Sequence, residues 1–384
     1  MASVSIDPAR AEAPVRSVIA DLISQGREVG LQTAAYLGGR QVVDVAMGAT
    51  AREGGSPVNR DTLFSIYSVA KGVTATCAHV LADRGLLDFD APIAELWPEF
   101  ARNGKQAITL RHVLTHRAGI PQMPDGVTPA MMMDWDRMTE AITDLEPILR
   151  VGQDNAYMAM SFGWVVGEMI RRADPRHRMV DVFLQEEICQ PLGIDSLFLR
   201  LPDAALPRYA EHSYVPDPSP PPDSLSARAI PYDVRLTPDV FSRPDVLRSL
   251  APAVNGIANA SSLARFFAML AGEGELDGVR VLSRERVRGL LVPRTADEEM
   301  EPVLGRPWRL STGGFFLRST HKPAAGTSET MLFAMGMGGS LAFADLDAGL
   351  AAAITHNHMF NARTAEEDPL LPVANAIRDG LGVP

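Results

Sequence analysis

Strand-like sequence at both ends of the chain brackets a long middle part whose signals are mostly helical. Residues 29–48 contain two apolar runs separated by Gly-Gly, the pattern of a β-hairpin. Residues 312–318, 340–345 and 349–355 look like successive strands close to the C-terminus. We therefore predict one sheet built from both ends of the chain, with a mostly helical lobe inserted between them.

The boundaries of these parts follow from the same pattern. Residues 1–85 and 250–384 are assigned to the α/β sheet domain and residues 86–249 to the inserted lobe. Helical spacing of apolar residues predicts helices at 7–25, 68–84, 109–115, 138–149, 162–172, 180–187, 261–272 and 372–381. Proline is dense over 202–252, which predicts a long irregular surface loop that is a candidate lid or pocket wall.

Composition excludes several classes of protein. The 384 residues carry a formal net charge of −11, which would be repelled by phosphate backbones, so no nucleic-acid partner is expected. No apolar run has the length of a signal peptide or of a membrane span, which favours a cytoplasmic protein with no membrane partner. Cys77 and Cys189 are expected to be free buried thiols in a reducing compartment. The oligomeric state is left open.

The sharpest chemical signal is the tetrapeptide from Ser68 to Lys71. Residues three apart on a helix share a face, so a helix opening at Ser68 places its hydroxyl beside the Lys71 amine. The helix N-terminus also favours a developing alkoxide. Lysine occurs only at Lys71, Lys105 and Lys322 among 36 basic residues, and arginine cannot give up its proton as a base must. The pattern predicts a serine nucleophile with a lysine base.

The spacing alone is not decisive. Residues 319–322 also fit S-x-x-K, but they end a predicted strand and run into Pro323, so no helix follows. Without further context, Ser68 and Lys71 would equally fit a helix cap followed by a solvated lysine.

Further motifs supply that context. They lie at 62–88 (TLFSIYSVAKGVTATCAHVLADRGLLD), 97–100 (WPEF), 114–119 (LTHRAG), 157–172 (YMAMSFGWVVGEMIRR), 255–256 (NG) and 338–345 (GGSLAFAD). In this order they resemble serine β-lactamase-like esterases, the family VIII carboxylesterases related to class C β-lactamases and to penicillin-binding-protein-type acyltransferases. The resemblance covers nearly the whole chain. It implies an α/β (α+β) fold with an antiparallel sheet flanked by helices.

The resemblance also implies roles for individual residues. Ser68 would be the acylated nucleophile and Lys71 a general base. Tyr157 matches the tyrosine of the family's second motif, which reads Tyr157-Met158-Ala159 here. A phenol held partly ionised near Lys71 would relay a proton to the leaving group. The alternative for Tyr157 is a core tyrosine with a bonded hydroxyl.

The third motif departs from the family pattern. Where β-lactamases carry K-T-G and the esterases often H-G-G or H-T-G, the chain has Ala334-Met335-Gly336, and no Lys or His lies between Lys322 and His356. This loss argues against a β-lactam or D-Ala-D-Ala substrate. The resemblance still implies that the backbone N–H groups of Ser68 and Met337 form the oxyanion hole. The substrate-binding residues that we expect are Met158, Ala334, Met335, Gly336 and Gly338.

Methionines at several other positions suggest an apolar, adaptable wall, although methionine more often fills cores. The residues concerned are Met131, Met132, Met133, Met331 and Met337.

Three other patterns that contain serine or histidine are interpreted as structural rather than catalytic or metal-binding. Ser340 loosely fits a G-x-S-x-G elbow, but the downstream Asp345, Asp347, His356 and His358 are crowded into one apparent hairpin. His356 and His358 lack a convincing third metal ligand, so no metal and no cofactor are expected. His116 is expected to brace a loop.

The combined expectation is a serine esterase that forms an acyl-enzyme on Ser68 from an apolar, natural-product-like ester or thioester. One alternative is an acyltransferase, transesterase or cyclase of secondary metabolism that passes the acyl group to an alcohol or amine. A second is a non-catalytic binding protein on the same fold. Peptidase or β-lactamase activity is a minor alternative.

Overall fold

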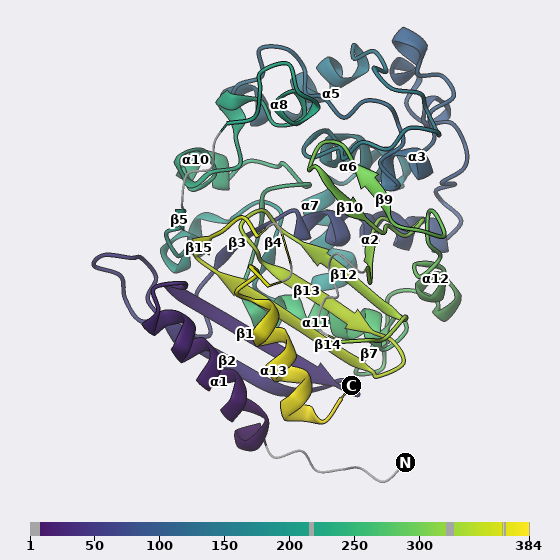
Figure 1. Ribbon diagram of the computed structural model, residues 1–384. Coiled ribbons are helices and arrows are strands. Elements are labelled where there is room, and N and C mark those ends of the chain that lie inside the picture. Colours follow the sequence, from purple (N-terminus) through teal and green to yellow (C-terminus); the bar gives the residue numbers. More distant parts are fainter. Residues whose placement is uncertain (1–7, 215–218, 320–325, 363, 365, 384) are drawn as a thin grey trace.

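The computed structural model describes residues 8–214, 219–319, 326–362, 364 and 366–383. Its main sheet has six antiparallel strands in the order β11-β12-β13-β14-β1-β2. The strands are β1 (Gly30–Leu37), β2 (Arg40–Gly48), β11 (Phe316–Leu317), β12 (Met331–Met335), β13 (Leu341–Asp345) and β14 (Leu350–His356). The hairpin near the N-terminus thus joins the C-terminal strands, as the sequence predicted (Figure 1).

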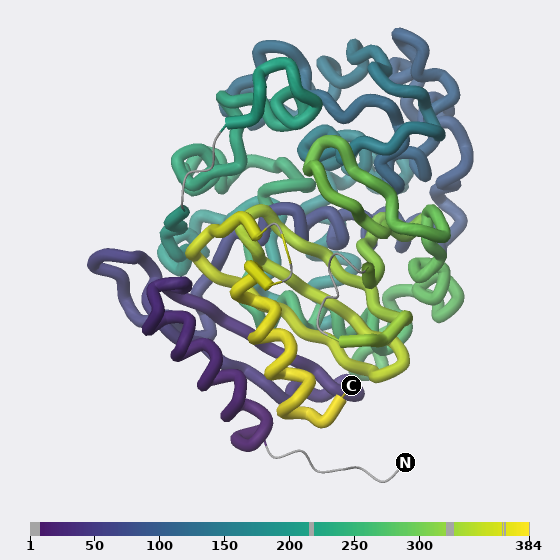
Figure 2. Tube along the Cα trace, in the orientation of Figure 1, coloured from purple at the N-terminus to yellow at the C-terminus, as the bar shows by residue number. Residues whose placement is uncertain are grey.

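Helices cover the sheet on both faces. Helices α1 (Pro8–Ser24) and α13 (Leu371–Leu381) pack side by side on one face, and α11 (Ala260–Ala271) contacts β1, β13 and β14 on the other (Figures 1 and 2). The apolar residues of α1 recur at helical spacing, with Val15, Ile19 and Leu22 buried. This layering removes the apolar side chains of both sheet faces from water.

The helix α2 (Val69–Asp83) lies between the sheet and the helical part of the molecule. It contacts β12 on one side and α6 (Ser161–Ala173) on the other. Close packing needs a glycine here, because a Cβ on Gly72 would lie 2.9 Å from the Phe315 ring and 3.3 Å from the Ala334 side chain. The first turn of α2 is thereby held against β12 of the main sheet.

A second, small sheet contains the strand that directly precedes α2. Its strands are β3 (Phe64–Tyr67), β6 (Gly256–Ala258) and β4 (Leu197–Phe198), in the order β3-β6-β4. Tyr67, the last residue of β3, has φ 44°, a conformation that L-residues adopt at an energetic cost. The turn at Tyr67 redirects the chain from β3 straight into α2.

The remaining elements are short. Between α2 and α6 lie helical turns at Ile93–Glu95 and Pro98–Gly104, followed by α3 (Leu110–Leu114), α4 (Pro129–Met132) and α5 (Trp135–Thr143). After α6 come α7 (Val180–Leu184), a turn at Gln185–Cys189, another at Asp203–Arg208, β5 (Ser213–Tyr214), α8 (Leu225–Ala229), a turn at Tyr232–Val234, α9 (Pro238–Phe241) and α10 (Pro244–Leu247). The C-terminal half adds β7 (Glu275–Leu276), β8 (Val279–Arg280), α12 (Arg284–Gly289), β9 (Glu299–Glu301), β10 (Arg306–Trp308) and β15 (His358–Met359).

Three local predictions were wrong. The helix expected at 138–149 instead occupies Trp135–Thr143, because the Asp134 side chain caps it by accepting from the Arg137 N–H. The strand expected at 312–318 is reduced to Phe316–Leu317, after a turn that includes Gly314 at φ 89°. The segment 202–252 contains several short helices, two of which begin at a proline, rather than one irregular loop.

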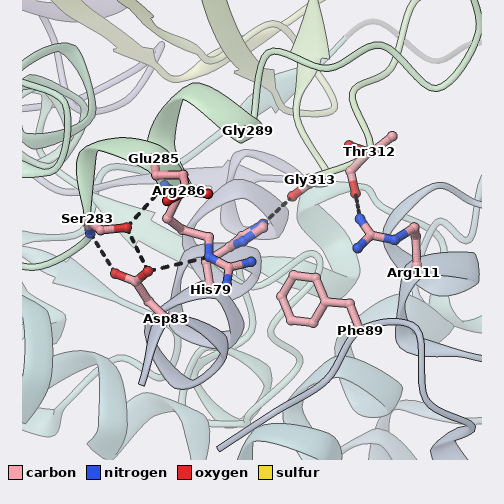
Figure 3. A pocket seen from close by; sticks show the side chains of 10 residues that line it. All are labelled: His79, Asp83, Phe89, Arg111, Ser283, Glu285, Arg286, Gly289, Thr312 and Gly313. Atoms are coloured by element: carbon pink, nitrogen blue, oxygen red, sulfur yellow. Dashed lines mark hydrogen bonds and ion pairs between the residues drawn. The ribbon is translucent and has the colours of Figure 1, made fainter. Parts of the chain in front are cut away.

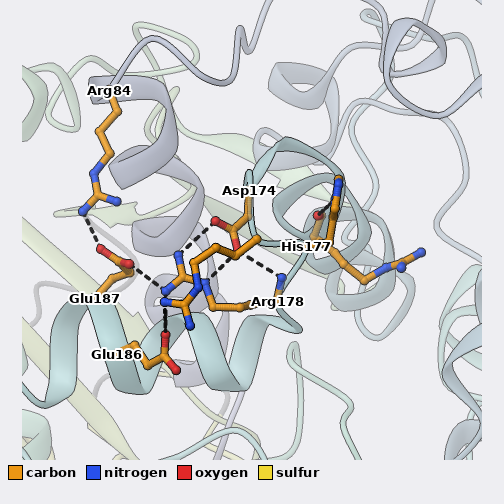
Figure 4. A network of polar contacts seen from close by, with 8 residues as sticks. Arg84, Asp174, His177, Arg178, Glu186 and Glu187 are labelled. Carbon is orange, nitrogen blue, oxygen red and sulfur yellow. Dashed lines mark hydrogen bonds and ion pairs between the residues drawn. The ribbon is translucent and has the colours of Figure 1, made fainter.

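A charged cluster joins Arg84, the residue after α2, to the segment between α6 and α7 and to the turn that follows α7 (Figure 4). Arg178, only 8% exposed in its side chain, pairs with Asp174, Glu186 and Glu187 at 2.7–2.8 Å, and Arg84 pairs with Glu187 at 2.7 Å. The Arg178 guanidinium beside Asp174 lowers the pKa of that carboxyl to about 2. Asp174 is therefore ionised and paired at neutral pH.

Two further sequence predictions can be compared with the structure. Cys77 and Cys189 are buried free cysteines, as predicted. Among the described helices, none combines the length and the apolar composition that crossing a bilayer requires.

Candidate active site

Ser68 lies at the junction between β3 and α2. It is the N-cap residue of α2 but makes no side-chain capping bond, so its hydroxyl is available for other contacts. The residue is 8% exposed. The predicted geometry is present, because the Lys71 Nζ lies 3.0 Å from the Ser68 Oγ. The two side chains therefore meet one helical turn apart.

The Lys71 amine is held by the backbone as well. Its Nζ donates to the carbonyl oxygen of Ala159 at 2.7 Å and to that of Ala253 at 3.1 Å. The residue is 5% exposed, and burial lowers the pKa of the Lys71 amine well below its ordinary value. A neutral amine has two N–H donors and one lone pair. The Lys71 Nζ thus contacts three oxygens; in the neutral form, donation to the two carbonyls leaves the lone pair for the Ser68 hydroxyl.

Tyr157 lies against this pair. The Lys71 Nζ is 4.7 Å from the centroid of its ring. Burial raises the pKa of the Tyr157 phenol, and a hydrogen bond with the Ser68 side chain offsets this effect only in part. The expectation of a partly ionised phenol is therefore wrong: desolvation keeps the phenol protonated. A protonated phenol beside Ser68 is a proton donor rather than a base.

The segment that carries Tyr157 has no regular secondary structure, and side chains from elsewhere hold it. The His116 Nδ1 accepts from the Met158 N–H at 3.1 Å, and the His116 carbonyl accepts from the Ala156 N–H at 3.0 Å. Burial lowers the pKa of His116 well below its ordinary value, so the ring is neutral and its Nδ1 is free to accept. His116 thus braces this loop, as the sequence indicated.

The strand β12 and the turn after it form the opposite side of the site. Gly336 is required there, because a Cβ at this position would lie 2.3 Å from the Ile66 carbonyl oxygen, two residues before Ser68. In the described part of the chain, no hydrogen bond uses the N–H of Ser68 or of Met337 as a donor. The backbone at these two positions is therefore free to donate to a ligand.

The predicted substrate-binding residues differ in exposure. Met337 is 38% exposed and Met335 is half-buried, whereas Ala334 is buried on β12. Gly338 adopts φ 84° in the turn. Met158 is fully buried in the hydrophobic core, which makes it a packing residue in this structure. Contact of the other predicted residues with a substrate stays a prediction.

The other methionines that we expected in an apolar wall divide in the same way. Met131, Met132 and Met331 are buried in the core, and Met133 is exposed.

Two contributions to the site were not predicted from the sequence. One is the pair of backbone carbonyls at Ala159 and Ala253, which lie 88 and 182 residues from Lys71. The other is Glu301, a buried carboxylate that accepts from the Tyr157 N–H at 2.6 Å. No local motif marks Glu301; its burial at the end of a short strand was the only available signal, and that emerges from the fold.

The acidic and histidine residues that follow Ser340 in the sequence contact partners other than Ser340. Asp345 pairs with Arg378 at 2.7 Å, and His356 contacts Glu28 at 2.8 Å, so neither forms a triad with Ser340. The second S-x-x-K motif, at 319–322, lies mostly outside the described residues.

A cavity of about 420 Å³ opens beside the other end of α2 (Figure 3). It is lined by His79, Phe89, Arg111 and Arg286, among others. His79 is eleven residues beyond Ser68, about 16 Å along the helix axis. Burial lowers the pKa of His79 to about 4, and its Nε2 lies 2.9 Å from the Gly313 carbonyl oxygen. This cavity is separate from the Ser68 centre.

Comparisons with known proteins agree with this geometry. The Beta-lactamase family model matches residues 15–375. Esterase/beta-lactamase LipL of Mycobacterium tuberculosis is 33% identical over 85% of this chain and 77% of that protein. A family VIII carboxylesterase structure superposes with a TM-score of 0.88 at 28% identity, covering 96% of this chain and 97% of that one. A penicillin-binding protein homologue from Caulobacter crescentus gives 0.86 at 29% identity, covering 98% and 99%.

These matches confirm the predicted α+β fold, with its antiparallel sheet and flanking helices. The chain belongs to the beta-lactamase family and is a serine hydrolase of the β-lactamase-like superfamily.

Proposed function

We propose that the protein is a serine esterase that forms an acyl-enzyme on Ser68. The observation that carries this proposal is the 3.0 Å contact between the Ser68 Oγ and a buried Lys71 amine that also donates to the carbonyls of Ala159 and Ala253. Esterase-named relatives support ester hydrolysis in general. An acyl-enzyme splits one difficult displacement into two easier ones.

Acylation of Ser68 is the proposed first half-reaction. The Ser68 oxygen attacks the ester carbonyl while its proton passes to the Lys71 amine. The oxyanion accepts hydrogen bonds from the N–H groups of Ser68 and Met337. When the tetrahedral intermediate collapses, the bond to the alcohol oxygen breaks, and that oxygen receives a proton from the Tyr157 phenol, which regains one from the Lys71 ammonium.

In the second half-reaction, water attacks the acyl carbonyl and gives up a proton to the Lys71 amine, and the Lys71 ammonium returns that proton to the serine oxygen in the next step. The Ser68–acyl bond then breaks, the serine oxygen is reprotonated, and the carboxylic acid leaves. If an alcohol or amine replaces the water, the same residues transfer the acyl group instead.

The substrate that we propose is apolar and lacks a carboxylate next to the scissile bond. The strand β12 carries Ala334 and Met335 where the family pattern has a basic or imidazole side chain, so no cation is offered to such a carboxylate from that position. Met337 exposes an apolar side chain at the turn beside the proposed oxyanion donors. A natural-product ester or thioester fits this description.

The test uses p-nitrophenyl acyl esters and intact-mass spectrometry. We expect a covalent acyl adduct on the wild type and none on Ser68→Ala. If no ester gives either an adduct or turnover, the protein is a binding protein and the proposal fails. Added alcohols or amines that divert product from the free acid would identify a transferase.

A further inference from the structure

The position of Tyr157 depends on a carboxylate that comes from a separate hairpin. Glu301 ends β9 and is fully buried. Its Oε1 accepts from the Tyr157 N–H at 2.6 Å and from the Val303 N–H at 3.0 Å, and its Oε2 accepts from the Leu304 N–H at 2.6 Å. One oxygen is thus shared between the tyrosine and the hairpin, so the two move together.

Placing an ionisable side chain at this fully buried position is energetically unfavourable. Burying a carboxylate costs free energy unless it is hydrogen-bonded or paired. Burial accordingly raises the pKa of Glu301, while the three backbone N–H groups and the nearby charge of Arg294 favour its ionised form. Hydrogen bonds to an ionised acceptor are shorter and about twice as strong as neutral ones. The short contact to Tyr157 offsets part of that cost.

The contact acts on the catalytic group in two ways. It fixes the backbone of Tyr157 in a segment that has no ladder or helix of its own. The negative charge of Glu301 also opposes ionisation of the phenol. Asn155 ties the same two segments together, because its side-chain amide donates to the Met300 carbonyl at 2.9 Å.

We propose that Glu301 is a positioning residue for Tyr157, whose side chain it holds beside Ser68 through its contact with the Tyr157 N–H. This inference rests on the proposed esterase function. It assigns to the β9–β10 hairpin a part in acylation, although no side chain of this hairpin is placed at the reacting atoms.

Three variants separate the parts of this contact. Glu301→Gln keeps one oxygen for the Tyr157 N–H and loses the charge, so we expect acylation within about tenfold of wild type. Glu301→Met removes the acceptor, and Glu301→Asp withdraws it by one methylene. For both we expect the acylation rate constant to fall about 10²-fold with little change in KM, because a small misplacement of a catalytic group is enough for such a loss.

The control is Glu299→Gln on the same strand. Glu299 pairs with Arg117 at 2.7 Å and Arg294 at 2.9 Å, and no hydrogen bond within the described residues links it to Tyr157. It should acylate like the wild type. Circular dichroism identifies which variants are folded, and Glu301→Asp replaces Glu301→Met if the latter does not fold.

A double-mutant cycle with Tyr157→Phe tests whether Glu301 acts through the phenol. We expect Tyr157→Phe and Glu301→Met, or Glu301→Asp in its place, each to slow acylation when made alone. When Tyr157→Phe is already present, the Glu301 substitution should slow acylation almost no further, because members of one catalytic unit are non-additive. Additive losses, or no loss in Tyr157→Phe, would overturn the inference. Persistence of the acyl adduct in Ser68→Ala would instead overturn the proposed function, so the two failures are distinguishable.

Discussion

Replacement of Lys71 by arginine tests the central feature of the site. The Lys71 amine is buried and donates to two carbonyls while it faces the Ser68 hydroxyl. Burial lowers the pKa of the Lys71 amine, and no carboxylate among the described residues acts to raise it. A guanidinium keeps its proton at any ordinary pH and cannot accept one from serine. Lys71→Arg therefore places a permanent positive charge at this position and removes the base.

The expected magnitude follows from that loss. General-base catalysis contributes about 10²–10⁴-fold, so we expect acylation to slow by about 10³-fold, equivalent to about 4 kcal/mol at 1.36 kcal/mol per factor of ten. The larger side chain also overpacks a buried site, which typically costs about 1–3 kcal/mol of stability. Activity must therefore be measured per folded molecule.

The assay is stopped-flow acylation by a p-nitrophenyl ester, with the folded fraction taken from circular dichroism. Lys105→Arg is a matched control, because Lys105 is also fully buried and donates to the carbonyls of Arg102, Thr143 and Leu145, remote from Ser68 along the chain. It should lose stability but acylate normally. Acylation of Lys71→Arg within about tenfold of wild type would refute the assignment of Lys71 as the base.

Three further outcomes are expected. Because burial lowers the pKa of Lys71, its reactive neutral form exists above that lowered pKa, so kcat/KM should fall on acidification as the amine gains a proton, which a pH–rate profile measures. In Gly336→Ala, the new Cβ would lie 2.3 Å from the Ile66 carbonyl oxygen and should displace the neighbouring Met337 N–H. We expect this variant to keep its fold and to acylate about 10²–10³-fold more slowly. An acylation rate equal to that of the wild type would argue against the Met337 N–H as an oxyanion donor. The pKa of Asp174 is lowered to about 2, so its contribution to stability is complete above about pH 4, the unfolded value, and is lost as the pH falls through 2. The stability of Asp174→Asn, measured by urea unfolding, should therefore decline less between pH 4 and pH 2 than that of the wild type.

The sequence by itself determined the features that depend on local spacing. Ser68 and Lys71 are three positions apart, a spacing that places two side chains on the same face of a helix. The contact between them was therefore predictable once the helix was recognised. The sheet built from both chain ends was predictable because the strand and helix periodicities differ. The rarity of lysine pointed to Lys71, and Lys105 shows the same preference for a compact amine among carbonyls.

The tertiary structure decided everything that depends on long-range contact. The carbonyls of Ala159 and Ala253 reach Lys71 from distant segments, and Glu301 reaches Tyr157 across 144 residues. The protonation states follow from these contacts, because burial lowers the pKa of Lys71 and raises that of Tyr157. Desolvation depends on how much of the whole chain surrounds a group, and no short stretch of sequence contains that information.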